Sequence, residues 1–277
     1  MFTTMPLMMQ ALLWGAVAGG ALLLGALIGY YVKLPKALSS SIMAFGIGVL
    51  ISALAFDLMT EAFDVGGLWA AIAGFSAGAA LYAVANLALA MAGARHRKRS
   101  AGSGGGASLA IAIGSLLDDI PESAAIGMSL LGGEGVALVT VIAIFLSNIP
   151  EGLSSSIGMK AEGKTARYVF SLWGGIAAMC AISALLGYTV IGAMTPFWIG
   201  AATAVAAGAI LVMLVDTVVP EAFEDIHALS GIIAAAGFLF AFSLSHGRLG
   251  RIDYCVLPRI ILLYFAHNNF LYELYYR

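Results

Sequence analysis

The segment LDDIPES, residues 117–123, returns in altered form as LSNIPEG, residues 146–152. Both segments lie in the middle of otherwise apolar sequence. A carboxylate at bilayer depth costs about 2.5–3.5 kcal/mol on insertion scales, so such groups are retained mainly where they hold an ion or a proton. The duplicated motif therefore predicts an ion site inside a membrane.

The composition also indicates a membrane protein. Of the 277 residues, 61% are hydrophobic and 10% are charged, and the mean hydropathy is +0.99. Soluble domains contain about 45–50% apolar residues, so we exclude an ordinary water-soluble globule. The formal charge of −2 indicates no nucleic-acid-binding surface. Cys180 and Cys255 are too few and too far apart to predict a disulfide framework or a thiolate metal site, and we interpret both as packing residues.

A membrane-spanning helix needs about 20 mostly apolar residues. We therefore expect an all-α, polytopic membrane fold, with a transmembrane domain over residues 1–246 that contains eight spanning helices. The expected ranges are 8–31, 39–63, 67–92, 107–131, 135–159, 166–191, 197–220 and 228–246. The first range lacks a preceding basic residue and is long enough to span, so we interpret it as a retained helix and not as a signal peptide.

Basic residues predict the orientation. They gather in the first, third and fifth expected connections, which lie on one side of the membrane: Lys33, Lys36, Arg95, Arg97, Lys98, Arg99, Lys160, Lys164 and Arg167. The positive-inside rule places these loops in the cytoplasm and, with an even number of helices, both termini outside. Residues 93–106, basic and then Gly/Ser-rich, are expected to form a cytoplasmic linker.

Residues 247–277 form an atypical C-terminal tail. Ala and Gly nearly vanish there, while Tyr and Arg become frequent. Its apolar run Ile260–Ala266 is too short to span a bilayer. An interfacial segment, a disordered segment and a segment foreign to the natural chain all agree with this composition, and we assign the tail no function.

Helical spacing groups the polar residues of the two motifs. Asp119 and Glu122 are three positions apart, and Asp118 and Glu122 are four apart, so all three can project toward one side of a helix. Asn148 and Glu151 repeat the three-residue spacing, with Ser147 in the place of Asp118.

The prolines add backbone oxygens at the same level. Pro121 and Pro150 cannot donate to the carbonyls of Leu117 and Leu146, which leaves those oxygens free and bends each helix. Consecutive spans run antiparallel, so the two motifs should meet near the bilayer midplane in an inverted relationship, as is typical of transporter sites.

A second pair of segments suggests another internal repeat. Asp57 and Glu61 in FDLMTEAF, residues 56–63, resemble Asp216 and Glu221 in DTVVPEAF, residues 216–223. Intramembrane acids mark ion pathways, so these four residues are candidates for an entrance or exit route. We expect Asp216 to approach the central site most closely.

These motifs resemble those of the ZIP (Zrt/Irt-like) divalent metal transporters, and the resemblance covers about residues 8–246. Members typically show His-Asn-x-Pro-Glu-Gly on the fourth helix and a related Pro-Glu pattern on the fifth. The resemblance implies eight helices and uptake of a divalent metal toward the cytoplasm by alternating access. It implies metal-site positions on the fourth and fifth helices and near the seventh, namely Asp118, Asp119, Glu122, Ser147, Asn148, Glu151 and Asp216.

The chain departs from the family pattern in its ligand types. Asp118 stands where His is usual, Asp119 where Asn is usual, and Ser147 where His or Gln is common. Imidazole suits zinc, copper and iron, whereas carboxylate and hydroxyl ligands suit harder ions such as manganese. Zinc is the family default for the transported ion, and Mn²⁺, Fe²⁺ and Cd²⁺ are further candidates.

The sequence also bears on enzyme activity, on other substrates and on assembly. The chain has neither His-Glu-x-x-His nor Gly-x-Ser-x-Gly, and we do not expect an enzyme. A proton-coupled transporter of small organic cations is the alternative function, because the same acids could bind an amine; it would need aromatic residues around the site. A homodimer is compatible with the sequence, and we expect the protein in the plasma or inner membrane of the cell.

Overall fold

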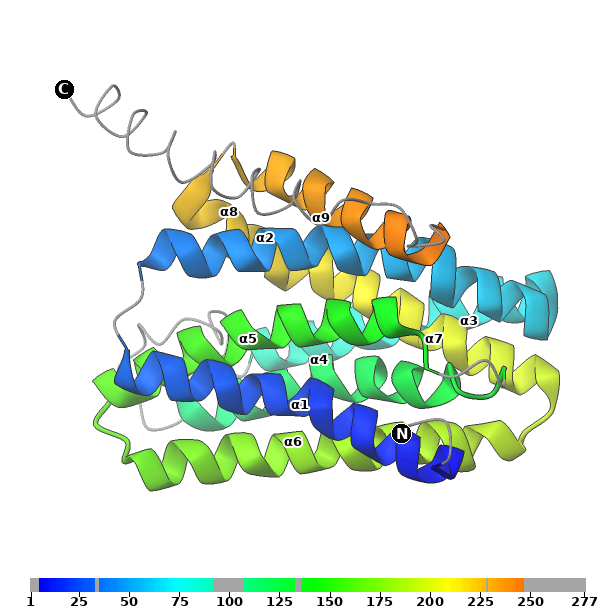
Figure 1. Cartoon of the computed structure of the whole chain (residues 1–277), viewed down its shortest axis with the longest axis horizontal. Helices are drawn as coiled ribbons and strands as arrows, with labels where there is room; N and C mark the ends of the chain where they lie inside the picture. Colours follow the sequence, from blue (N-terminus) through cyan, green and yellow to red (C-terminus); the bar gives the residue numbers. More distant parts are fainter. Residues whose placement is uncertain (1–4, 33–34, 92–106, 133–135, 228, 247–277) are drawn as a thin grey trace. The chain divides into compact units, whose positions relative to one another are not determined.

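The computed structural model describes residues 5–32, 35–91, 107–132, 136–227 and 229–246. Every regular element in these ranges is helical, which confirms the predicted all-α class. Figure 1 shows their arrangement. The elements are α1 (Leu7–Tyr31), α2 (Lys36–Ser52), η2 (Ala53–Leu58), α3 (Met59–Leu89), α4 (Ala107–Met128), α5 (Leu138–Ala161), α6 (Ala166–Thr189), η4 (Ile191–Ala193), α7 (Pro196–Met213), η5 (Leu214–Val218), α8 (Val219–Ile226) and α9 (Leu229–His246).

Several of these helices can cross a membrane. Five helical stretches of the described residues are long and apolar enough: Leu7–Tyr31, Ala37–Leu89, Leu138–Ala161, Ala166–Ala193 and Pro196–Glu224. The protein is therefore a multi-pass helical membrane protein. The stretch Leu229–Ser245 is also apolar but shorter.

The longest stretch is interrupted at a glycine. Ala37–Leu89 has 53 residues, which corresponds to about 80 Å of helix at 1.5 Å per residue, against a hydrocarbon core of about 30 Å. Gly67 has φ 78° and ψ 175°, a conformation that favours glycine, and two helices meet there at a kink. The expected ranges 39–63 and 67–92 lie on the two sides of this kink, with the first helix continuing a few residues further than expected.

Helix packing gathers α1, α4, α5 and α6. Helix α1 packs extensively against α5 and α6, and α4 packs against α6, whereas α4 and α5 touch each other little. Helices α3 and α7 make the most extensive contact between any two elements. Helix α2 lies against α5 and α8, and α1, α5 and α6 run side by side in Figure 1.

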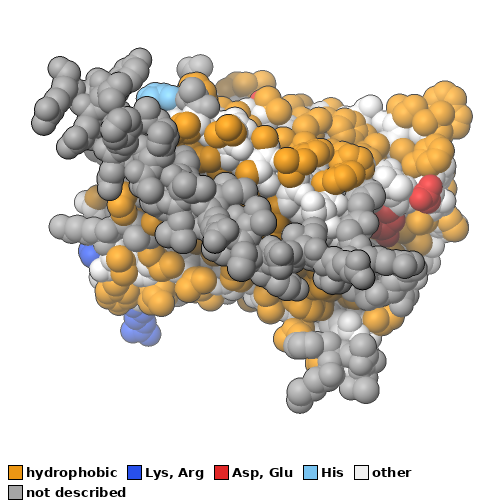
Figure 2. All heavy atoms as spheres, turned by 45° about the horizontal axis from the view of Figure 1, so that its top comes forward, with side chains coloured by type: hydrophobic (Ala, Val, Ile, Leu, Met, Phe, Trp, Pro, Cys, Tyr) orange, Lys and Arg blue, Asp and Glu red, His pale blue; other side chains and the backbone are white. Residues whose placement is uncertain are grey.

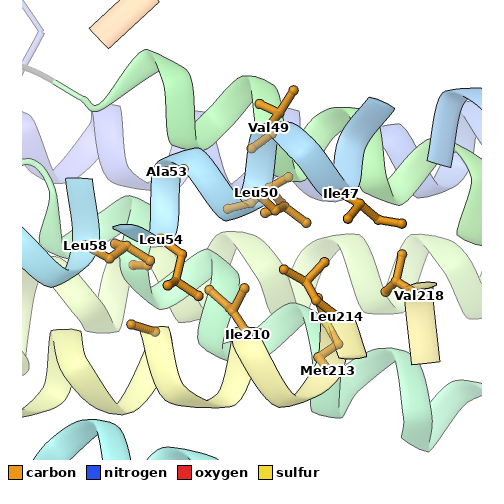
Figure 3. Packing of buried hydrophobic residues seen from close by; sticks show 14 of the residues in the cluster. Ile47, Val49, Leu50, Ala53, Leu54, Leu58, Ile210, Met213, Leu214 and Val218 are labelled. Carbon is orange, nitrogen blue, oxygen red and sulfur yellow. The ribbon is translucent and has the colours of Figure 1, made fainter. Parts of the chain in front are cut away.

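The larger core joins the α2–η2 segment to the α7–η5 segment (Figure 3). Leu50, Leu54 and Leu58 from the first segment pack toward Ile210 and Leu214 of the second. A smaller core lies where α1, α5 and α6 meet, and its members include Leu22, Met159, Trp173 and Cys180. Lipid tails are as apolar as Leu, so close van der Waals packing holds these helices together.

The outer surface suits lipid. Figure 2 shows a face on which hydrophobic side chains predominate over the described part of the surface, with few charged ones. Large apolar side chains such as Trp69, Leu81 and Ile232 are exposed by more than half of their surface. In water such a surface would mark an association site, and in a bilayer it faces the hydrocarbon.

Several predictions concern residues outside the described ranges. The linker 93–106, the tail 247–277 and most of the basic residues used for orientation lie there. The orientation of the termini stays a prediction. Contacts divide the chain into the units Met1–Ser245 and His246–Arg277, and only the first is described below.

Candidate metal centre

Helix α4 carries its three acids into the protein interior. Asp118, Asp119 and Glu122 are 2%, 1% and 2% exposed, and α4 continues through Pro121 without ending. The adjoining Ser123 is equally buried. Three acidic side chains within five residues of a buried helix carry a high desolvation cost unless a cation or protons compensate them.

Helix α5 brings a second set of buried polar groups to the same region. Asn148 is 1% exposed and Glu151 is 5% exposed. The Ser115 hydroxyl of α4 donates to Glu151 Oε1 over 2.6 Å. This bond links the two motif helices directly, although they otherwise make little contact.

The other polar residues of the α5 motif bond elsewhere. Asn148 Nδ2 donates to the backbone oxygen of Ala18 in α1 over 3.1 Å. Ser147 is half-buried, and its hydroxyl donates to the Ile144 oxygen of its own helix over 3.0 Å. The amide oxygen of Asn148 therefore stays available, whereas the Ser147 proton is already engaged.

The α4 acids adjoin two different helices. The Tyr82 hydroxyl of α3 donates to Asp118 Oδ1. Asp119 and Glu122 lie within electrostatic range of Cys180 in α6, as does Glu151. Asp118 thus contacts α3, whereas the other three acids act electrostatically on a residue of α6.

A side chain of α6 fixes that helix against the α4 motif. Ser183 Oγ donates to the backbone oxygen of Ile120 over 2.8 Å. Ile120 lies between Asp119 and Pro121, where the proline already weakens the backbone hydrogen bonding of the helix. This hydrogen bond attaches α6 to α4 at the residue that follows Asp119 in the sequence.

The described acidic side chains do not form a preassembled metal site. Within the described ranges, no three His, Cys, Asp or Glu residues lie close enough together to hold one metal ion. Binding of a cation by these acids would therefore require side chains from α4, α5 and their neighbours to converge.

Asp57 and Glu61 lie together beside α5 and α9. Ser245 Oγ donates to Asp57 Oδ1 over 3.0 Å, and Thr140 Oγ1 lies 3.5 Å from Asp57 Oδ2. Glu61 is half-buried and interacts electrostatically with Asp57. The pair therefore combines two carboxyl groups with hydroxyls from two further helices.

Asp216 and Glu221 are the acids of the second segment, five positions apart where Asp57 and Glu61 are four apart. Asn86 Nδ2 of α3 donates to Asp216 Oδ2 over 3.4 Å, and Ser154 Oγ of α5 donates to Glu221 Oε1 over 3.3 Å. Asp216 is exposed and accepts this hydrogen bond from α3, so its expected approach to the central acids stays a prediction.

Both aspartates lie in π-helical segments. Asp57 belongs to η2 (Ala53–Leu58) and Asp216 to η5 (Leu214–Val218). Single π-helical turns are rare and occur frequently at functional sites. In both segments the aspartate therefore lies in a π-helical turn that precedes the glutamate by a few residues.

Three residues near the acids were not singled out from the sequence. Ser115 is four positions before Asp119, so helical periodicity would have placed it on the same side of α4. Tyr82 is 36 positions from Asp118, and Cys180 lies on another helix. No local pattern indicates such long-range neighbours.

Comparison with known proteins gives one relative. No family model matches the chain. A protein of Arabidopsis thaliana described as a putative zinc transporter is 28% identical over 209 residues, which cover 73% of this chain and 33% of that protein. The similarity supports the resemblance to metal transporters. The match spans about a third of the length of the plant protein.

Removal of the Ser115 hydroxyl tests the link between the motif helices. We expect Ser115→Ala to raise the KM for metal uptake by about tenfold, because loss of a ligand's hydrogen-bond partner typically costs about 10- to 100-fold in metal affinity. Uptake by reconstituted protein measures it. Ser171→Ala is the matched control, because Ser171 is exposed and donates only to Tyr168 of its own helix. Equal KM values for the two variants would contradict the role of Ser115.

Proposed function

We propose that the protein carries divalent metal ions across the membrane toward the cytoplasm, with Zn²⁺ as the main substrate and Mn²⁺, Fe²⁺ and Cd²⁺ as further candidates. The observation that carries the proposal is the burial of Asp118, Asp119, Glu122 and Glu151, each at most 5% exposed, in the helices of a strongly apolar chain. The similarity to a plant protein described as a putative zinc transporter agrees with it.

The electrostatics favour a mobile divalent cation. Several carboxyl groups in one buried region repel one another when ionised and are stabilised by an ion of opposite charge. Oxygen ligands from two helices bind such an ion, while water can replace them at either membrane face. A site of this kind binds the ion reversibly.

Alternating access gives the ion its route. Glycines bring α1 close to α5 and α6, at Gly25 and Gly19, and α4 close to α6, at Gly127, which allows close approach and sliding of these helices. A rigid-body shift of these helices would expose the acids first outward and then inward. Asp57, Glu61, Asp216 and Glu221 are proposed to mark the route to and from the acids.

The proposed topology has eight crossings with both termini outside. The two halves of Ala37–Leu89 on either side of Gly67 supply two crossings, and α4 and α9 are counted beside the longer helices. Helix α4 contains three acids and is therefore less apolar than the five long stretches. The chain is proposed to reside in the plasma or inner membrane of the cell.

Transport of small organic cations is the second candidate. An amine would use aromatic rings around the acids for cation–π contact. Tyr82 is the aromatic residue that contacts Asp118, and it does so through its hydroxyl group. The sequence around both motifs is dominated by Ala, Ser, Gly, Ile and Leu, which favours a metal ion.

Ion uptake into proteoliposomes tests the proposal. Purified protein is reconstituted, and entry of Zn²⁺, Mn²⁺, Fe²⁺, Cd²⁺ and tetramethylammonium is measured against protein-free vesicles. Saturable uptake of a divalent metal is the expected result. Uptake of the organic cation alone, or of no ion, would overturn it.

A further inference from the structure

One end of the helix bundle gathers basic and aromatic side chains. Helix α1 ends there at Tyr31, α5 ends at Ala161, and α6 begins at Ala166 (Figure 1). The Lys and Arg side chains visible in Figure 2 lie at the same end. The segment that joins α5 to α6 supplies three cations and one acid, which together with the nearby aromatic rings are called the basic end: Lys160, Lys164, Arg167 and Glu162.

Aromatic rings line the basic end. Tyr30 Oη donates to the backbone oxygen of Lys164 over 3.2 Å, which ties the end of α1 to the connection between α5 and α6. The Tyr31 ring stacks on the Phe170 ring of α6, with centroids 6.0 Å apart. Tyr31 is 62% exposed and Tyr168 is 40% exposed. Tyrosine is enriched where a bilayer meets water, because its ring is apolar and its hydroxyl is polar, so these rings indicate the level of the lipid headgroups.

Two of these rings position the lysines. Lys160 Nζ lies 4.9 Å from the centre of the Tyr30 ring and donates to the Tyr30 backbone oxygen. Lys164 Nζ lies 5.2 Å from the centre of the Tyr168 ring. A cation above an aromatic ring is attracted by the ring and keeps its positive charge. An ammonium group has three donors, so Lys160 can donate to a further acceptor besides the Tyr30 oxygen.

Helix electrostatics alone do not account for the three cations. The macrodipole favours cations at the C-terminal end of a helix and anions at the N-terminal end. Lys160, in the last turn of α5, follows this preference. Lys164 and Arg167 do not, because they lie at the start of α6, whose first turn carries no acidic residue. An anion supplied from outside the chain would stabilise this arrangement of charges.

We infer that the basic end binds the headgroup of an anionic phospholipid. The chain is a multi-pass helical membrane protein, so the ends of its helices meet the two lipid leaflets. Ammonium and guanidinium groups bind a phosphate through charge-assisted hydrogen bonds. The predicted orientation places the basic end at the cytoplasmic leaflet, where anionic lipids give the surface a negative potential. This binding is independent of which ion the protein carries.

The aromatic rings favour a lipid over a soluble phosphate. A soluble anion would use the cations alone, whereas a phospholipid also covers the apolar faces of Tyr31 and Tyr168 with its upper acyl carbons. Glu162 is half-buried in the same segment, and its charge lowers the formal charge of the basic end to +2. A lipid headgroup with one negative charge is therefore compatible with the charges that surround it.

Lipid binding by the purified wild type is the first test. Protein in a neutral detergent is titrated with phosphatidylglycerol or with phosphatidylcholine of the same acyl chains, and native mass spectrometry counts the bound lipids. The first phosphatidylglycerol should bind at least about tenfold more tightly, because one Lys or Arg near an anionic lipid surface contributes about fivefold in affinity. Equal affinities would overturn the inference. Displacement of the bound lipid by an equal concentration of inorganic phosphate would also overturn it, because the occupant would then be a soluble anion.

Charge removal gives the second test. K160Q/K164Q/R167Q should lower the preference for phosphatidylglycerol by about tenfold or more. R97Q/K98Q/R99Q is the matched control, because it removes the same charge from another basic segment of the chain and should keep the wild-type preference. An undiminished preference in the first variant, or an equal loss in both, would overturn the assignment of the lipid to the basic end. The comparison of the two lipids on the wild type does not depend on the folding of either variant.

Discussion

Glu122→Gln and Glu151→Gln should each reduce saturable metal uptake by about 100-fold or more. Each change removes one negative charge and one strong oxygen ligand but keeps the size of the side chain. Loss of an indirect partner already costs about 10- to 100-fold in metal affinity, and a direct ligand should cost at least the upper part of that range. Initial rates of Zn²⁺ and Mn²⁺ entry into proteoliposomes measure the effect.

The thermal stability of both Gln variants, unlike their uptake, should stay equal to that of the wild type or rise. A neutral amide costs less to bury than a carboxylate, so we expect both variants to fold and to unfold in detergent at the same temperature as the wild type or a higher one. Glu224→Gln is the matched control, because Glu224 is exposed on α8 and lies outside the proposed centre. Wild-type uptake by both site variants would contradict the assignment of the centre, and so would an equal loss in the control.

The fold class could be predicted because it depends on local composition. Apolar runs of spanning length determine helices in a bilayer, and every described element is a helix. The end of the second helix was less predictable. The range was expected to end at residue 63, yet the helix continues to the kink at Gly67, where the backbone adopts φ 78°. That backbone conformation interrupts the helix.

The partners of the acids could not be predicted, because they depend on packing between distant segments. The spacing of Asp118, Asp119 and Glu122 allows all three to share one side of α4, but it does not tell which neighbouring helix each one meets. Asp118 meets Tyr82 of α3, while Asp119 and Glu122 lie near Cys180 of α6. Adjacent positions on a helix point about 100° apart, so neighbouring helices divide such a doublet between them.

The π-helical segments were likewise beyond prediction from the sequence. The repeat of Asp57 and Asp216 is visible in the residues, but the extra residue that each turn accommodates is not. Both segments belong to the core in which α2–η2 packs on α7–η5. Since the core fixes which side chains must face inward, the backbone there follows tertiary packing more than local preference.

Gly25→Ala should destabilise the protein and impair uptake, although it adds a single methyl group. The new Cβ would lie 2.1 Å from the backbone oxygen of Ile149, so α1 and α5 would have to separate. Overpacking of this kind typically costs about 1–3 kcal/mol, and a backbone oxygen cannot move aside as a side chain does. Ile149 lies between Asn148 and Pro150 in the motif, so separation would also strain the bond from Asn148 to Ala18.

Gly20→Ala provides the comparison on the same helix. A Cβ on Gly20 meets nothing within 4 Å, so this variant should keep full uptake and gain up to about 1 kcal/mol from the better helix propensity of alanine. Thermal unfolding in detergent and Zn²⁺ uptake measure both variants. Equal behaviour of the two would mean that close contact between α1 and α5 is not needed. A Gly25→Ala protein that keeps wild-type stability but loses uptake would instead indicate that the contact positions the α5 motif for the ion. In that case the added methyl group would have changed transport without changing stability.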